Sequence, residues 1–102
     1  MIMLYCPCPS KAVAQQLAID LLNKHLIGCA NILPMMASIY WWEGQITEEI
    51  EVVLLAKTLI ARQDAVRQAV EAAHPYTVPC IAFLPLEGVN EAYQNFVRRS
   101  LA

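Results

Sequence analysis

Residues 29–42, CANILPMMASIYWW, and residues 46–59, ITEEIEVVLLAKTL, flank the short stretch EGQ at residues 43–45. Both flanking segments are rich in the β-branched, aromatic and aliphatic residues that strands favour. The glycine-containing stretch between them has the composition of a tight turn. Pro34, which cannot donate to a strand ladder, interrupts the first segment. The pattern predicts a long antiparallel β-hairpin over roughly residues 30–58.

The length of this hairpin is out of proportion to the rest of the chain. Strands of about 13 residues, at about 3.3 Å per residue, reach about 43 Å, which is about twice the span of the other strands. Trp41 and Trp42 lie beside the far tip. A long uncovered strand pair with aromatic residues tends to aggregate unless another subunit covers it. We therefore expect partner subunits to cover the hairpin.

The flanking segments predict the other elements of one α+β domain over residues 1–102. The predicted elements are a strand at residues 1–5 ended by Pro7 and Pro9, a helix from the N-cap Ser10 to Gly28, a helix at 62–73, a strand at 78–84 and a helix at 90–99. The order β-α-β-β-α-β-α is the split βαβ, or ferredoxin-like, arrangement. It predicts an antiparallel sheet with helices on one face.

Composition narrows the classes of function. The chain is 58% hydrophobic and only 16% charged, which implies either membrane insertion or burial between subunits. No apolar run approaches the roughly 20 residues of a membrane-spanning helix, so assembly is the better interpretation. A net charge of −2 without a basic cluster excludes nucleic acid as a partner. Residues 1–5 lack the features of an export signal, so we expect a cytoplasmic protein with four free cysteines.

Several side chains are candidate ligands. Cys6 and Cys8 alternate on an extended segment, so their thiols point the same way and could bind a soft metal such as Cu(I), or they are ordinary buried thiols. Cys29 and Cys80 lie in apolar strand contexts, where burial is expected. His74, at a helix-to-strand junction, is either a metal ligand or proton carrier, or a junction residue hydrogen-bonded to backbone.

Charged residues add one acidic and one basic candidate. Glu48, Glu49 and Glu51 are either oxygen ligands for a divalent cation or a solvated strand face. Lys57 follows an apolar stretch, so its ammonium group must reach the sheet edge, a partner carboxylate or a ligand. No set of nucleophile, base and orienting residue is recognisable, and we expect no enzymatic activity.

Four motifs together resemble the CutA family of divalent-cation tolerance proteins. They are GCANI at residues 28–32, SIYWWEG at 38–44, EVVLLAKT at 51–58 and HPYTVP at 74–79. The resemblance covers nearly the whole chain in order. It implies a ferredoxin-like fold, a tight homotrimer built through the long hairpins, and a role in tolerance of copper and other divalent metals.

The resemblance also implies site residues. Cys29 and His74 match candidate metal-contacting positions of the family. Six further residues match positions in the family's inter-subunit cleft: Tyr40, Trp42, Glu51, Lys57, Tyr76 and Tyr93. Thr77 and Cys80 replace glutamates that are common in the family. Together with Cys6 and Cys8, Cys80 shifts the ligand set toward sulfur, which favours Cu(I) or Zn over Mg or Ca. Two alternatives to metal binding stay open, a sensor of a small anionic ligand similar to PII proteins, and a trimeric scaffold without ligand.

Overall fold

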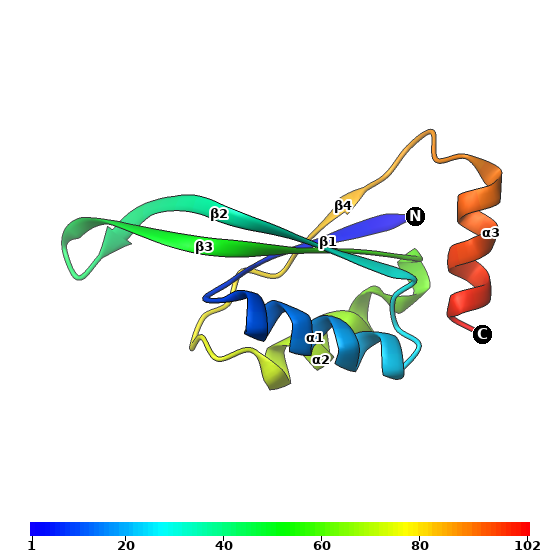
Figure 1. Cartoon of the computed structure of the whole chain (residues 1–102), viewed down its shortest axis with the longest axis horizontal. Helices are drawn as coiled ribbons and strands as arrows, with labels where there is room; N and C mark the ends of the chain where they lie inside the picture. Colours follow the sequence, from blue (N-terminus) through cyan, green and yellow to red (C-terminus); the bar gives the residue numbers. More distant parts are fainter.

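The computed structural model describes all of residues 1–102, and its elements follow the predicted order (Figure 1). The elements are β1 (Ile2–Cys8), α1 (Lys11–Asn23), β2 (Cys29–Trp42), β3 (Gln45–Thr58), the 3-10 turn η1 (Ile60–Arg62), α2 (Gln63–Ala73), β4 (Ala82–Pro85) and α3 (Glu91–Ser100). All strand pairs are antiparallel, in the order β2-β3-β1-β4. The predicted α+β ferredoxin-like fold is confirmed.

Helices α1 and α2 cover one face of the sheet, and α3 lies at the end opposite the hairpin tip (Figure 1). Every second residue of β1 is buried, because alternate side chains of a strand point to the same face. These side chains meet the helices in a single core, formed by Leu4, Cys6, Cys8, Ala14, Leu17, Ala18, Leu21, Ile27, Leu54, Ala56, Val66 and Val70. The other face, here called the open face, carries no helix. No helix of the chain is both long and apolar enough to span a membrane.

The hairpin has the predicted length. Strands β2 and β3 have 14 residues each and pair from Cys29–Lys57 to Trp42–Gln45. Glu43 and Gly44 turn the chain with φ angles of 50° and 78°, as a two-residue hairpin turn requires. The tip projects well past the helices, and the molecule is 46 Å long (Figure 1).

The apolar side of the sheet continues beyond the helices along this hairpin. Ile46 and Ile50 lie on the same face of β3 as Leu54, since their positions differ by even numbers. Cross-strand pairing adds side chains of β2 to this surface, here called the hairpin apolar face and formed by Ala37, Ile39, Trp41, Ile46 and Ile50. One exposed carboxylate, that of Glu48, lies among them opposite Ile39. Its four large side chains are between 62% and 71% exposed. The core face of the sheet therefore continues along the hairpin beyond α1 and α2 (Figure 1).

The first strand is longer than predicted. It runs through Pro7 to Cys8 and pairs with β3 throughout, but with β4 only as far as Tyr5. The carbonyl oxygen of Pro7 accepts a hydrogen bond from His74, so the backbone of Pro7 faces the side without a neighbouring strand. Because that side has no neighbouring strand, the missing N–H of Pro7 removes no hydrogen bond from the sheet, and the strand continues through it. The prediction that the strand ends at Tyr5 is therefore wrong.

The last strand is shorter than predicted. It begins at Ala82 rather than Val78, which is 87% exposed. His74 occupies the free side of β1 at Pro7, where residues preceding Ala82 would have to pair. Pro79 also lacks the N–H needed to continue the ladder.

The first helix ends earlier than Gly28. Its last residue is Asn23, and His25 takes the left-handed conformation with φ 56°. The predicted N-cap is confirmed, because Ser10 Oγ accepts a hydrogen bond from the N–H of Val13 at 3.2 Å. Gly28 does not cap the helix; it allows close packing against α3, because a Cβ atom there would lie only 3.0 Å from Val97.

Candidate functional site

Three candidate ligands, here called the Cys-His cluster, meet beneath the sheet. The sulfur atoms of Cys6 and Cys8 and a ring nitrogen of His74 all lie within 4.8 Å of one another. The two cysteines share a face of β1, and His74 directly follows α2. Both cysteines are fully buried, and His74 is 8% exposed. The fold therefore assembles two thiols and an imidazole from distant parts of the chain.

Both ring nitrogens of His74 are already hydrogen-bonded. The backbone N–H of Tyr76 donates to Nδ1 at 3.1 Å, which requires an unprotonated Nδ1. In the neutral ring, Nε2 then carries the proton and donates it to the carbonyl oxygen of Pro7 at 2.9 Å. The structure thus shows His74 as a junction residue bonded to backbone. A metal could use this imidazole only by displacing one of these two hydrogen bonds.

The two thiols of the cluster are not equivalent. Contact with the Cys8 sulfur, followed by burial, raises the pKa of Cys6. The hydrogen bond with Cys6 lowers the pKa of Cys8 despite its burial. Cys8 is therefore the residue of the pair that ionises first, with the Cys6 thiol as its donor. A metal that binds both sulfur atoms must displace the proton of Cys6.

Cys29 and Cys80 lie apart from this cluster. Cys80 is exposed, and Cys29 is half-buried on the open face, so the expected burial of both is wrong. Cys29 pairs with Lys57, whereas Cys8 pairs with Val52. These β3 positions are about 17 Å apart at about 3.3 Å per residue, so the structure does not bring Cys29 to His74.

The predicted cleft residues separate into groups. At the middle of the hairpin, Tyr76 Oη donates a 2.7 Å hydrogen bond to Glu51, which is only 8% exposed. Burial and this hydrogen bond raise the pKa of Tyr76. Tyr40 lies nearby, where desolvation and Glu49 raise its pKa. Trp42 is exposed at the tip of the hairpin.

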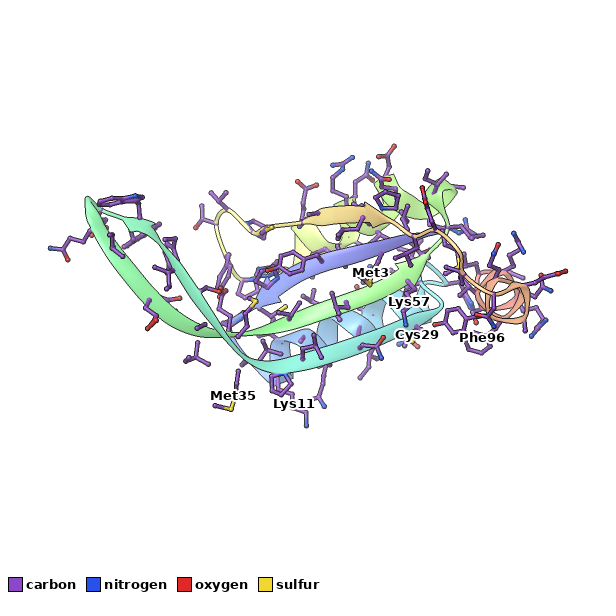
Figure 2. The ribbon with its side chains drawn as sticks, turned by 90° about the horizontal axis from the view of Figure 1, so that it is seen from above. Met3, Lys11, Cys29, Met35, Lys57 and Phe96 are labelled. Carbon is purple, nitrogen blue, oxygen red and sulfur yellow. The ribbon has the colours of Figure 1, made fainter.

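The remaining cleft residues form a second group at the other end of the sheet, here called the lysine cluster and comprising Cys29, Asn31, Lys57 and Tyr93. Lys57 Nζ donates to Asn31 Oδ1 at 3.0 Å and lies 5.3 Å from the centre of the Tyr93 ring. Figure 2 shows Lys57 and Cys29 side by side between Met3 and Phe96. Asn31 was absent from the predicted sites. The hairpin register could have indicated it, because Asn31 lies one step along the same face from Cys29.

Comparison with known proteins gives a consistent result. Residues 2–100 match the family model described as CutA1 divalent ion tolerance protein. The divalent-cation tolerance protein CutA of Thermus thermophilus is 39% identical over 92 residues, which are 90% of this chain and 89% of that protein. The protein CutA 1, chloroplastic, of Oryza sativa is 35% identical over 97% of this chain, which spans about 56% of the rice protein.

A solved structure extends the likeness to three dimensions. The structure of the periplasmic divalent cation tolerance protein CutA from Archaeoglobus fulgidus matches with a TM-score of 0.95 at 34% identity, over 100% of both chains. The prediction of a cytoplasmic protein is corrected by these relatives, because one is described as periplasmic and the rice protein as chloroplastic. Proteins with this fold are thus not confined to one compartment.

Proposed function

The chain belongs to the CutA family of divalent-cation tolerance proteins, and on this premise we propose that it is a homotrimer that binds a soft metal ion through Cys6 and Cys8. The observation that carries this proposal is the convergence of three ligand atoms within 4.8 Å in the Cys-His cluster. Two metal–thiolate bonds of about 2.3 Å each span at most about 4.6 Å, so the ligand atoms are close enough for one shared ion after a small movement of their side chains.

The donor set favours soft ions. Sulfur and imidazole select copper and zinc, whereas magnesium and calcium prefer oxygen ligands, and the cluster contains no carboxylate. Cys6 and Cys8 supply the first two ligands. His74 becomes a third ligand when one of its hydrogen bonds to Pro7 or Tyr76 is exchanged for the metal.

The site supports binding rather than catalysis. Both cysteines are fully buried in the core, and the cluster leaves little room for a substrate beside the ion. Metal binding would displace the protons of both thiols, since thiolates are the metal-binding form of cysteine. We therefore infer a non-enzymatic function in which metal occupancy stabilises the connection between β1 and α2.

The hairpin apolar face supports the trimeric part of the proposal. It carries four large side chains, of Ile39, Trp41, Ile46 and Ile50, that are mostly exposed in the single chain. An exposed apolar strand pair of this length is stable in water only when another surface covers it. A further copy of the chain is the occupant that the family resemblance favours, with three copies around one axis.

A metal titration tests the binding site. Reduced protein is titrated without oxygen against Cu(I) and Zn(II), each with a competing chelator, and thiolate-to-metal absorption is followed. Cys6→Ser and Cys8→Ser are expected to abolish the high-affinity phase, whereas the exposed Cys80→Ser serves as the matched control and retains it. Unchanged affinity in both buried variants would exclude this site.

A further inference from the structure

Lys57 has no carboxylate partner in the chain. The three ion pairs of the structure all lie along α1 or α2 and do not include it. The residue is half-buried on the open face, and its ammonium group contacts Asn31 Oδ1 and the face of the Tyr93 ring at an exposed position. An ammonium group has three N–H donors and Lys57 uses one of them on Asn31, so the lysine cluster has unused capacity to bind a negative charge.

Tyr93 supplies a second unused group at the same place. Its hydroxyl is buried and is the one buried side-chain polar atom of the chain without a hydrogen-bond partner. Burial and the neighbouring Cys29 sulfur raise the pKa of Tyr93 to about 12, so the hydroxyl keeps its proton at neutral pH. Sulfur is a weak acceptor, so this buried hydroxyl still lacks a strong one.

The backbone holds these groups in place. The N–H of Gly28 donates to the carbonyl oxygen of Lys57 at 2.8 Å, which joins the start of β2 to the end of β3. Gly28 also allows Val97 to approach closely, and this contact seats α3 against the sheet. Tyr93 lies four residues before Val97 and thus on the same side of α3. The donors are therefore positioned by packing rather than by a mobile loop.

We propose that Lys57 and Tyr93 form a binding site for a carboxylate group. The ammonium and the phenolic O–H supply two strong donors, whereas the one S–H of Cys29 is donated to Asn31 Oδ1 at 3.9 Å. One cation with one neutral donor matches a monoanionic carboxylate better than a phosphate dianion. The carboxylate belongs either to a small molecule or to an acidic side chain of a second copy.

The site is independent of the proposed metal site. It lies at the opposite end of β1, where Met3 pairs with Lys57, and shares no residue with the Cys-His cluster. Loss of metal binding in the cysteine variants therefore says nothing about the carboxylate, and the two proposals fail separately.

The test uses protein labelled with ¹³C at lysine Cε, in which Lys11 and Lys24 are internal references. Acetate is titrated at constant ionic strength against chloride and inorganic phosphate. Acetate is expected to shift the Lys57 signal saturably and to leave the references in place. Tyr93→Phe should weaken acetate binding about tenfold, because it removes one hydrogen bond to a charged group. Tyr5→Phe is the matched control, since that hydroxyl contacts the Met36 sulfur instead.

Dilution distinguishes the two sources of carboxylate. A Lys57 signal that responds to acetate assigns the site to a small molecule. A signal that ignores acetate in the assembled protein, but moves when dilution separates the subunits, assigns the carboxylate to a second copy. A response equal to that of chloride, or no response to either acetate or dilution, overturns the proposal.

Discussion

The Nε2 atom of His74 lies 2.9 Å from the carbonyl oxygen of Pro7, the residue between Cys6 and Cys8. This single hydrogen bond attaches the end of α2 to the part of β1 that lacks a neighbouring strand. It also determines where the two thiols stand relative to the ring. The histidine therefore has a structural role in the metal-free chain, whatever ligand the cluster accepts.

Replacing His74 should destabilise the protein even without metal. His74→Ala leaves the carbonyl of Pro7 and the N–H of Tyr76 without partners and creates a cavity, which should lower the free energy of unfolding by about 2–4 kcal/mol. Urea unfolding in the presence of a chelator, at one fixed protein concentration, measures this loss.

His25 provides the control for that experiment. It is exposed, its Nδ1 lies 3.2 Å from the carbonyl oxygen of Ser100, and its φ angle of 56° is one that asparagine tolerates. Loss of this exposed hydrogen bond in His25→Asn should lower the free energy of unfolding by no more than about 1 kcal/mol. Equal effects of the two substitutions would contradict the structural role of His74.

The hydrogen bond between Tyr76 and Glu51 should stabilise the middle of the hairpin. Tyr76→Phe removes the donor and leaves a carboxylate that is 8% exposed without its partner, at a cost of about 1–3 kcal/mol. Tyr5→Phe loses only a 3.5 Å contact to sulfur and should cost less. Thermal or urea unfolding of both variants compares them, and an equal loss would show that the 2.7 Å hydrogen bond contributes nothing special.

Assembly should depend on one face of the hairpin. Ile46→Glu adds a second carboxylate beside Glu48 in the hairpin apolar face and should reduce the mass in solution from that of three 11.4 kDa chains toward that of one. Gln45→Glu adds the same group to the opposite face, beside Trp42, and should leave the mass unchanged. Sedimentation equilibrium measures both. A wild-type protein that stays monomeric at micromolar concentration would contradict the trimer.

Alkaline pH should weaken the packing of α3. The pKa of Tyr93 is about 12 in the folded protein and 10.0 for the free side chain, so the folded state holds this proton more tightly. The stabilisation is complete below the unfolded pKa and is lost as pH rises through the folded one. Unfolding measured at about pH 9 and about pH 11 should show a smaller loss for Tyr93→Phe than for the wild type. An identical loss in both proteins would exclude this residue as the cause.

Local patterns were sufficient for most of the fold. Helical spacing, the Ser10 cap and the turn at Gly44 depend on residues close together in the chain, and these predictions were correct apart from the end of the first helix, which is Asn23 rather than Gly28. The errors at Tyr5 and Val78 have one common cause. Both strand ends are determined by His74, which is distant in sequence from Pro7 and binds its carbonyl oxygen.

The long hairpin, its turn and its alternating apolar residues could be deduced from the order of residues alone, because strand periodicity and turn chemistry are local properties. The order of residues alone could not show which candidate ligands come together in space. Of the five predicted metal residues, Cys6, Cys8 and His74 form a buried cluster, Cys29 lies beside Lys57, and Cys80 is an exposed thiol. Strand register and helix docking determine this division, because both depend on contacts across the whole chain.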